Sequence, residues 1–455
     1  MNRVDSGRQR QTSVAARGTS RRQFLHTGLT TLGGMALPAV VSARALGLEA
    51  APPPSDRIIM GAIGTGGRGQ SNLRTFLSQP DVQIIAVCDV DAAHAEAAKK
   101  IVDDHYGNAD CKIFKDQLLL LREPSIEAVS IATPDHWHAL SAVQAAREGK
   151  DVYCEKPLSG SIAEGRTICD AANRYGTILQ TGSQERSNNS VRQACDIVLS
   201  GRLGQLQRIV VNLPTDDPQH ARVRKQTALP PATEVPGGLD YDRWLGHTPS
   251  VPYIAERVHR MWRFVSRYGG GEMTDRGAHV IDLAQMFTGN DTSGPVLYEA
   301  EGKREASALY DTYLDFSFVN TYASGLRIVG GNQGPRGIGF EGTEGTLFVH
   351  IHGGKLEVNP ATLLLDTDRE PTFLSIGRSP GHHRNFLDCV RSREQPIANH
   401  EVGHRTATIC HINNLALMLQ RPLVWNPEAE QFVGDDEANS YLMPSMREPY
   451  TFTTI

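Results

Sequence analysis

Cysteine is scarce in this sequence, and its distribution excludes two classes of small protein. The 455 residues include seven cysteines, an odd number, and no two of them form a C-x-x-C pair. This excludes a disulfide framework and a cysteine-ligated zinc site, so most of the cysteines are expected to be small buried side chains. Charged residues make up 21%, which is typical of a globular chain, and the length favours two domains.

Long apolar runs are also missing from the body of the chain, so no membrane-spanning helix is expected there. The N-terminus differs. "SRRQFL" precedes an apolar stretch that runs to Val41 and is followed by the small residues "SARA". This order is typical of a secretory signal, and the Arg21–Arg22 pair resembles a twin-arginine export signal. We therefore expect a signal peptide at 1–45, a linker at 46–56, and export to the periplasm or beyond.

Basic residues are not in excess after this segment. Seven arginines and one acidic residue precede Leu46, so cleavage there changes the formal net charge from −5 to −11. A protein this acidic is not expected to bind nucleic acid or an anionic membrane surface. The twin-arginine translocase is an expected partner, and it carries proteins that are already folded, which agrees with unpaired cysteines.

Residues 57–185 alternate short apolar runs with helical patterns, which predicts a parallel, doubly wound α/β sheet of the Rossmann type. Strands are expected at 57–64, 82–91, 126–134, 151–157 and 176–183. Helices are expected at 71–79, 91–106, 138–149 and 161–175, the second of them capped by Asp91.

From residue 186 the pattern changes to longer strands joined by turns. It predicts an α+β domain at 186–455 with a large, mainly antiparallel open sheet. Strands are expected at 204–213, 309–319, 325–332, 338–353 and 355–360. The Pro- and Gly-rich segment 214–271 lies between the first two, and loops of this length are usually functional or disordered.

A glycine-rich motif lies where the first strand meets the first helix. It has the form G-x-G-x-x-G and comprises Gly64, Gly66, Gly67, Arg68 and Gly69. Such glycines let the backbone approach a pyrophosphate at the helix N-terminus, and Asp89, at the end of the second strand, is placed to bind ribose hydroxyls. The alternative is a plain glycine turn with an exposed aspartate.

The residues after Asp89 favour NAD over NADP as cofactor. Val90 and Asp91 follow it, and neither offers a cation for a 2′-phosphate. Arg68, inside the glycine loop, leaves NADP as the second choice.

Lys156, in "CEKPL", stands at the carboxyl end of a predicted strand, the edge where open α/β sheets bind ligands. Oxidation of a secondary alcohol removes a proton from oxygen as hydride leaves carbon. An ammonium beside that oxygen stabilises the developing alkoxide, and Pro157 restrains the backbone that holds it. A lysine that simply faces solvent at a strand end is the alternative.

A second group of polar residues occurs in "TDRGAHVIDLAQMF". Asp275, His279 and Asp282 are spaced i, i+4 and i+7, which places them on one face of a predicted helix. A solvated polar face would show the same spacing. Histidine, however, has an ordinary pKa of about 6.5, which suits reversible proton transfer near neutrality.

Five motifs together resemble the glucose-fructose oxidoreductase / inositol dehydrogenase (Gfo/Idh/MocA) family over nearly all of residues 57–455. They are "GAIGTGGRG", "AVCDVD", "IATPDHWHA", "CEKPL" and "GGGEMTDRGAHVIDLAQ", and the tail "HHRNFLDCVRSREQP" resembles a planctomycete-type branch. The resemblance implies that His279 is the general acid/base, Asp275 its partner at the reacting hydroxyl, and Lys156 the electrostatic and proton-relay group. It also suggests a cis bond before Pro157 and a homo-oligomer, a dimer or tetramer, formed through the open sheet.

One motif departs from the family pattern, which is Thr-Pro-Asn-x-x-His. Thr133, Pro134 and His138 match it as cofactor-binding residues, but Asp135 stands where the family has asparagine. His136 and His138 form H-x-H, yet no third ligand is near in the sequence, so no metal site is predicted.

Further side chains are candidates for the site. Glu155 is expected either to bind near the nicotinamide or to cap a turn. Arg186 lies where the two domains should meet, and aromatic and polar groups of the long loop suit a sugar ring. The candidate substrate ligands are Arg186, Trp262, Arg263, Tyr268 and Asp282, whereas His382 and His383 receive no role.

These features predict an exported, NAD-dependent oxidoreductase that acts on a secondary hydroxyl of a sugar, a sugar derivative or a cyclitol. Free NAD is scarce outside the cytoplasm, so a tightly bound cofactor is expected. One alternative is an NAD-dependent glycosidase or lyase that works by transient oxidation at ring C3 and elimination. Another is a redox-silent sugar-binding protein on the same fold.

Overall fold

The structure is a computed structural model that describes residues 52–352, 355–364 and 381–452. The predicted signal peptide at 1–45 and the first part of the linker lie outside these residues. All seven cysteines lie within them, and each is buried and unpaired, as predicted. Among the described residues no helix has the length and apolar character needed to cross a membrane.

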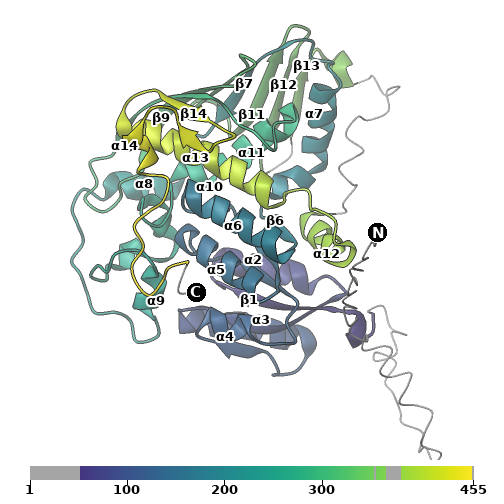
Figure 1. The fold of residues 1–455 in the computed structure, drawn as a ribbon, viewed down its shortest axis with the longest axis vertical. Coiled ribbons are helices and arrows are strands. Elements are labelled where there is room, and N and C mark those ends of the chain that lie inside the picture. The colour runs from purple at the N-terminus through teal and green to yellow at the C-terminus, as the bar shows by residue number, and fades with distance from the viewer. Residues whose placement is uncertain (1–51, 353–354, 365–380, 453–455) are drawn as a thin grey trace, which may run out of the picture. The chain divides into compact units, whose positions relative to one another are not determined.

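The first half forms a parallel six-stranded sheet in the order β3-β2-β1-β4-β5-β6, which confirms the doubly wound fold (Figure 1). Its strands are β1 Ile58–Ile63, β2 Val82–Cys88, β3 Lys112–Phe114, β4 Ala128–Ile131, β5 Asp151–Cys154 and β6 Leu179–Thr181. β1, β4 and β5 are almost wholly buried because both faces of a parallel sheet are covered by helices. The short edge strand β3 has no long apolar run and was not predicted.

Helices cover the two faces of this sheet in separate groups. The helices are α2 Gly67–Leu77, α3 Ala92–Tyr106, α4 Gln117–Leu121, α5 Asp135–Arg147 and α6 Ile162–Tyr175. α2 and α3 pack in one apolar cluster, and α4, α5 and α6 pack in another. The predicted cap is confirmed, since the Asp91 side chain accepts a hydrogen bond from the backbone N–H of Ala93 at 2.9 Å.

The second half is built on a nine-stranded sheet in the order β13-β12-β11-β7-β10-β9-β8-β14-β15. The strands are β7 Leu206–Asn212, β8 Leu297–Arg304, β9 Tyr313–Thr321, β10 Arg327–Gly331, β11 Gly337–Gly342, β12 Thr346–His350, β13 Leu356–Asn359, β14 Leu423–Asn426 and β15 Gln431–Phe432. Only β7 and β10 pair in parallel, so the predicted, mainly antiparallel sheet is confirmed.

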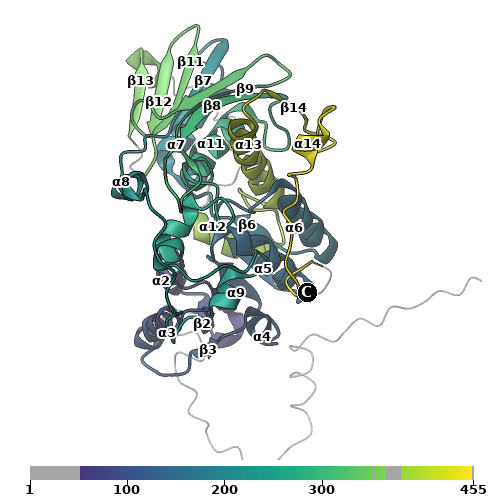
Figure 2. The same cartoon turned by 90° about the vertical axis from the view of Figure 1, so that its left-hand side faces the viewer.

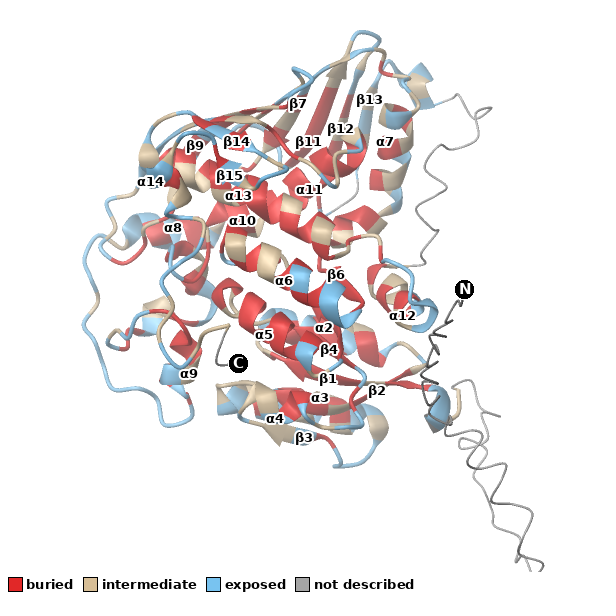
Figure 3. Cartoon of the chain, viewed as in Figure 1, coloured by how far each residue is buried: buried red, intermediate tan, exposed pale blue. Residues whose placement is uncertain are grey.

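Three helices cover one face of this sheet: α7 Asn189–Leu199, α11 Gly277–Thr288 and α13 His400–Leu419 (Figures 1 and 2). Figure 3 shows that α11 and α13 are largely buried. Short α10, Glu272–Asp275, precedes α11 directly. The core of the second half lies between these helices and the strands.

The C-terminal part of the chain returns to the first half. α12, His382–Ser392, places Phe386 and Leu387 in the apolar cluster that contains Phe76 of α2 and Tyr153 of β5. This helix belongs to the predicted second domain, 186–455, and packs against the first half. Apolar side chains mark α12 as buried, but the sequence does not show which half buries it.

The long segment 214–271 is ordered. It contains α8 Pro218–Lys225 and α9 Tyr241–Leu245, and it has its own aromatic core. Its backbone pairs with the first half: Leu239 bridges to Asp91, and the Ala92 N–H donates to the Gly238 carbonyl at 2.9 Å. The segment therefore packs against the carboxyl end of β2.

Candidate functional site

A cavity of about 910 Å³ lies at the carboxyl ends of β1, β2, β4 and β5. Residues of both halves line it, including the glycine loop, the turn after β5, the long segment and the start of α11. In the strand order, β1 and β4 are neighbours from which the chain proceeds in opposite directions, and open α/β sheets bind ligands at such a switch point.

The glycine loop has the backbone geometry that a dinucleotide requires. Gly64 has φ +76°, and a Cβ there would lie 2.6 Å from the Thr133 backbone nitrogen. A Cβ at Gly69 would collide with the Gly64 carbonyl oxygen. Both positions therefore need glycine, for the turn itself and for close packing of the helix against the strand.

The start of α2 offers an uncapped helix N-terminus to the cavity. Gly66 is its N-cap and makes no side-chain cap, and a Cβ at Gly67 would meet no atom within 4 Å. Gly64, Gly66, Gly67 and Arg68 line the cavity, whereas Gly69 packs behind them. Free backbone N–H groups and open space fit a pyrophosphate.

Asp89 lies beside the glycine loop and is held by the backbone. Its Oδ2 accepts a hydrogen bond from the Thr65 N–H at 2.6 Å, and its Oδ1 accepts one from the Asp91 N–H at 2.9 Å. Oδ2 also accepts a hydrogen bond from the Thr65 hydroxyl at 3.3 Å, so Oδ1 keeps a lone pair for a further donor. Together with the glycine loop, this carboxylate fits the ribose and pyrophosphate of a nicotinamide dinucleotide.

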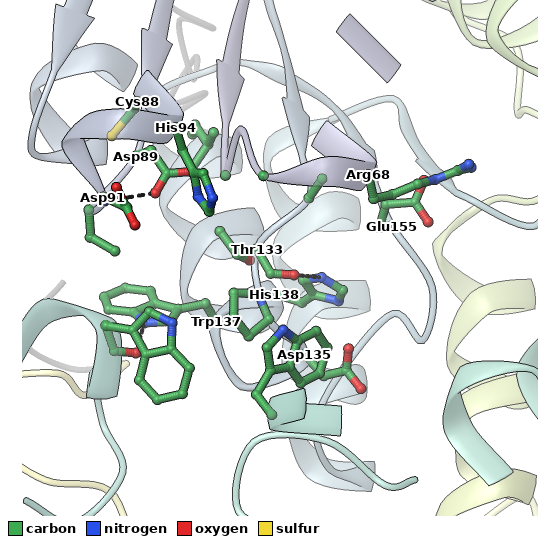
Figure 4. A pocket seen from close by; sticks show the side chains of 18 of the residues that line it. Arg68, Cys88, Asp89, Asp91, His94, Thr133, Asp135, Trp137, His138 and Glu155 are labelled. Carbon is green, nitrogen blue, oxygen red and sulfur yellow. Dashed lines mark hydrogen bonds and ion pairs between the residues drawn. The ribbon is translucent and has the colours of Figure 1, made fainter. Parts of the chain in front are cut away.

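Arg68 and Glu155 form a pair well apart from Asp89, as Figure 4 shows. Glu155 accepts hydrogen bonds from Arg68 Nε at 2.8 Å, Asn72 at 2.9 Å and Gln184 at 3.1 Å. Burial alone would raise the pKa of Glu155, but Arg68 and Asn72 hold it below its ordinary value. Glu155 therefore binds side chains rather than capping a turn, and its contact with Arg68 is through Nε.

Lys156 meets Asp275 across the two halves of the protein. Its Nζ lies 2.7 Å from Asp275 Oδ1 and 2.8 Å from the Asp275 carbonyl oxygen, and both residues line the cavity. The bond to Pro157 is cis. Burial would raise the pKa of Asp275, but Lys156 and Arg263 hold it far below its ordinary value. The site therefore keeps one ammonium and one carboxylate in contact.

His279 lies on the same cavity one helical turn after Asp275. The predicted single helix is broken at Arg276 into α10 and α11, but Asp275 and His279 still face one cavity. The His279 Nδ1 is buried and has no hydrogen-bond partner among the described residues, which leaves Nε2 for the cavity. Burial, with Lys156 next, holds the pKa of His279 well below its ordinary value, so the imidazole is neutral and can accept a proton.

The structure corrects the prediction for Asp282 and Arg186. Arg186 is fully buried and pairs with Asp282 at 2.7 and 2.8 Å and with Asp291 at 2.7 Å. Neither Arg186 nor Asp282 lines the cavity. This cluster ties β6 to α11 and leaves no donor for a substrate. His279 and Asp282 lie in the same helix, α11, but only His279 lines the cavity, whereas Asp282 binds Arg186 and Thr406.

The Thr-Pro-Asp-His-Trp-His segment enters the cavity at the start of α5. Thr133, Pro134, Asp135 and His138 all line it, and Figure 4 shows His138 beside the Thr133 carbonyl. The two His138 ring nitrogens lie 2.6 Å from the Pro157 carbonyl oxygen and 3.1 Å from that of Thr133. Burial raises the pKa of Asp135 well above its ordinary value, which favours the protonated carboxyl.

Of the three substrate ligands predicted in the long segment, two line the cavity and one does not. Trp262 and Arg263 line the cavity, with the Arg263 guanidinium 4.5 Å from the Trp262 ring centre. Tyr268 does not line it; it packs against Trp244 at 4.9 Å between ring centres. Tyr268 is thus part of the aromatic core of the segment, which corrects its assignment as a substrate ligand.

Several lining residues were missed by sequence reasoning. They are His94, Gln117, Trp137, Gln219, Arg243, Trp244, His259, Arg260, Pro449 and Tyr450. Trp137 lies inside a recognised motif and could have been found there. Pro449 and Tyr450 carry no signal, because they reach the cavity only through the path of the C-terminal chain.

Other histidines have structural partners. His136 Nε2 lies 2.9 Å from the Trp244 carbonyl oxygen, and His382 Nε2 lies 2.8 Å from that of Thr181. His383 stacks on Tyr153.

Among the described residues, Asp91, His94 and His259 form one group whose possible metal-ligand atoms all lie within 4.8 Å of one another, on the Asp89 side of the cavity.

Models of two known domain families match this chain. Residues 58–183 match the model for the "oxidoreductase family, NAD-binding Rossmann fold", and residues 187–452 match the "oxidoreductase family, C-terminal alpha/beta domain". The chain belongs to the Gfo/Idh/MocA oxidoreductase family. The second model alone covers more than half of the sequence, and the two models together include every lining residue of the cavity.

Individual relatives of this Gfo/Idh/MocA chain match over shorter stretches. An inositol 2-dehydrogenase of Rubrobacter xylanophilus is 30% identical over 152 residues, which are 33% of this chain and 42% of the relative. A glycosyl hydrolase family 109 protein of Saccharopolyspora erythraea is 32% identical over 202 residues, 41% of this chain and 44% of the relative. The chain spans about half the length of the curated relatives it matches first.

Solved structures show the same fold. The WlbA dehydrogenase of Bordetella pertussis, solved in complex with NADH and UDP-GlcNAcA, superposes with a TM-score of 0.60 at 16% identity. The match covers 81% of this chain and 99% of that one. At this identity the likeness supports the two-domain fold alone.

Proposed function

We propose that this protein is an NAD-dependent oxidoreductase that acts on a secondary hydroxyl of a sugar, a sugar derivative or a cyclitol. The observation that carries the proposal is the meeting of Lys156, Asp275 and His279 on one cavity, beside a glycine loop that fits a dinucleotide. When NAD is bound, its nicotinamide supplies the hydride acceptor.

The chain's own residues handle the proton. His279, neutral and open to the cavity through Nε2, accepts the hydroxyl proton of the substrate. Lys156 places its ammonium where the oxygen becomes negative, and Asp275 fixes the position of that ammonium. Trp262 and Arg263 give the cavity an aromatic face and a cation, which suit a ring that bears hydroxyl groups.

The test begins with the purified full chain. The nucleotide released on denaturation is identified, and its absorbance in the intact protein is followed with myo-inositol, free aldoses and 4-nitrophenyl glycosides. We expect NAD and a change in its reduction state with at least one hydroxyl compound. Recovery of NADP would contradict the cofactor assignment. A panel-wide absence of turnover with NAD bound would favour the redox-silent alternative.

A second candidate, a redox-neutral glycosidase or lyase, is favoured by the similarity to a glycosyl hydrolase family 109 protein. Transient oxidation at ring C3 would acidify the C2 proton and allow the aglycone to be eliminated, and return of the hydride would end the cycle. The two candidates differ in net redox change. Release of a keto sugar supports the oxidoreductase, whereas release of a reducing sugar with unchanged NAD supports the glycosidase.

Export by the twin-arginine pathway, a tightly bound cofactor and a homo-oligomer remain parts of this proposal. The signal-like sequence at 1–45 supports export, and the exposed face of the second sheet supports assembly. Fractionation of cells that express the full chain tests the first point, and light scattering of the purified protein tests the last.

A further inference from the structure

The catalytic site proposed above leaves one question about proton balance. Oxidation of an alcohol leaves one proton on His279, and this proton must reach solvent before the next turnover. His279 is only 7% exposed, and its Nδ1 is buried without a hydrogen-bond partner among the described residues. A buried polar atom of this kind needs an explanation in the neighbouring groups.

A second imidazole, that of His352, lies next to His279. The ring centres of His279 and His352 lie 5.3 Å apart with the rings nearly perpendicular. The other charged groups that act on His279 are Lys156, Asp275 and, more distantly, Arg68. Of these neighbours, Lys156 and Asp275 already bind each other.

His352 joins this buried site to the surface. It follows the end of β12, and its side chain is 49% exposed, although it contacts His279. Its backbone is in the left-handed region, with φ +62°, where histidine is found more often than most residues other than glycine.

Glu185, just after β6, holds His352 by two contacts. Its Oε1 accepts a hydrogen bond from the His352 backbone N–H at 3.1 Å and lies 3.1 Å from the His352 Nδ1. The other oxygen, Oε2, is buried and has no partner among the described residues. With Nδ1 beside Glu185, the second ring nitrogen of His352 is left for proton exchange.

We propose that His352, oriented by Glu185, carries protons between His279 and solvent, in direct contact or through one water. The inference rests on the proposed function, because it assigns the exit of the proton that His279 accepts. The step moves one proton and no electrons: the His279 imidazolium loses the proton from Nδ1, and His352 accepts it and releases it to buffer. Water in the cavity then moves the remaining ring proton from Nε2 to Nδ1, so that Nε2 is again free to accept a proton. His352 is thus a relay and does not touch the substrate.

The test compares His352→Asn with His350→Ala in the full chain with its nucleotide. Asparagine tolerates the left-handed backbone but does not titrate. His350 lies two residues earlier and pairs with Glu357 at 3.0 Å on β13, so its variant controls for loss of a nearby histidine. We expect His352→Asn to lower turnover about tenfold at low buffer concentration. High concentrations of imidazole should restore most of this loss, and His350→Ala should match the parent.

A second readout does not depend on turnover. In protein labelled with ¹⁵N-histidine, exchange of the His279 ring proton with water should slow in His352→Asn and, less strongly, in Glu185→Gln, which keeps the backbone contact. Unchanged exchange together with turnover that imidazole does not affect would overturn the relay. If the parent protein itself shows no hydride transfer, the proposed function fails, whereas the exchange measurement still decides whether His352 exchanges protons with His279.

Discussion

Two of the ion pairs that join the halves of this protein do different things. Lys156–Asp275 and Arg186–Asp282 each link the carboxyl edge of the parallel sheet to the α10–α11 region, 119 and 96 residues further along the chain. The first pair is partly exposed to the cavity, with side chains 13% and 20% exposed. The second pair is buried, with side chains 0% and 1% exposed. A pair that keeps contact with a cavity can serve chemistry, and a pair without access serves structure.

The difference follows from what each cation has as partners. The Arg186 guanidinium donates hydrogen bonds to Asp282 and Asp291, so every charged group in the cluster has a partner of opposite charge within the protein. Lys156 contacts one carboxylate and one carbonyl oxygen and retains a third N–H. That donor is the one that an alkoxide in the cavity can use.

The largest expected effect is on folding and comes from the closed pair. Arg186→Met leaves Asp282 and Asp291 without their cation, and breaking a buried pair in this way lowers the free energy of unfolding by about 3–5 kcal/mol. Chemical denaturation measures it. Turnover per folded molecule should change little, because Arg186 does not line the cavity. A stable but inactive variant would instead put Arg186 in the site.

The second-largest effect is expected when the ammonium that faces the cavity is removed. Lys156→Met should lower turnover by about 10²–10³-fold, since it removes the charge that stabilises the developing alkoxide. The melting temperature and the amount of resident nucleotide should remain near those of the parent. Turnover within a few-fold of the parent would exclude Lys156 from the mechanism.

A smaller effect is expected in the pH dependence of oxidation. Burial, then Lys156, lower the pKa of His279, so the acidic limb of kcat/KM should lie below pH 6.5, where the base becomes protonated. Lys156→Met removes a positive neighbour and should move this limb to higher pH. Asp275→Asn removes a negative neighbour and should move it to lower pH. Shifts of equal sign in both variants would contradict the assignment of the limb to His279.

The smallest effect is expected for a third pair that lies on the surface. Arg208 and Glu341 face each other on β7 and β11 with side chains 53% and 35% exposed. Water and salt screen such pairs, so Arg208→Ala should leave both melting temperature and turnover unchanged. A clear loss of stability would show that the exposed fraction of the side chains does not explain why the other two pairs differ in role.

Local sequence patterns were sufficient for much of the site. The glycine loop, Asp89 and the strand that ends before Lys156 could all be predicted, because short-range backbone geometry determines them. Their position at one sheet edge follows from parallel pairing, which brings the carboxyl ends of the strands together. Asp275 and His279 were found by spacing and resemblance.

Other residues could not be predicted, because their positions depend on distant packing. Tyr268 and Asp282 have the composition of ligands, yet one packs in the aromatic core of the long segment and the other pairs with Arg186. Tyr450 reaches the cavity through the path of the C-terminal chain.

The sequence by itself determined the Rossmann half, the dinucleotide loop and the residue types available for proton transfer, since each depends on neighbours within a few positions. Only the tertiary structure decided which of two similar ion pairs faces a cavity, and that a second imidazole lies against His279. Burial and contact between segments far apart in the chain depend on how both sheets pack with their helices, and no local pattern in the chain records that packing.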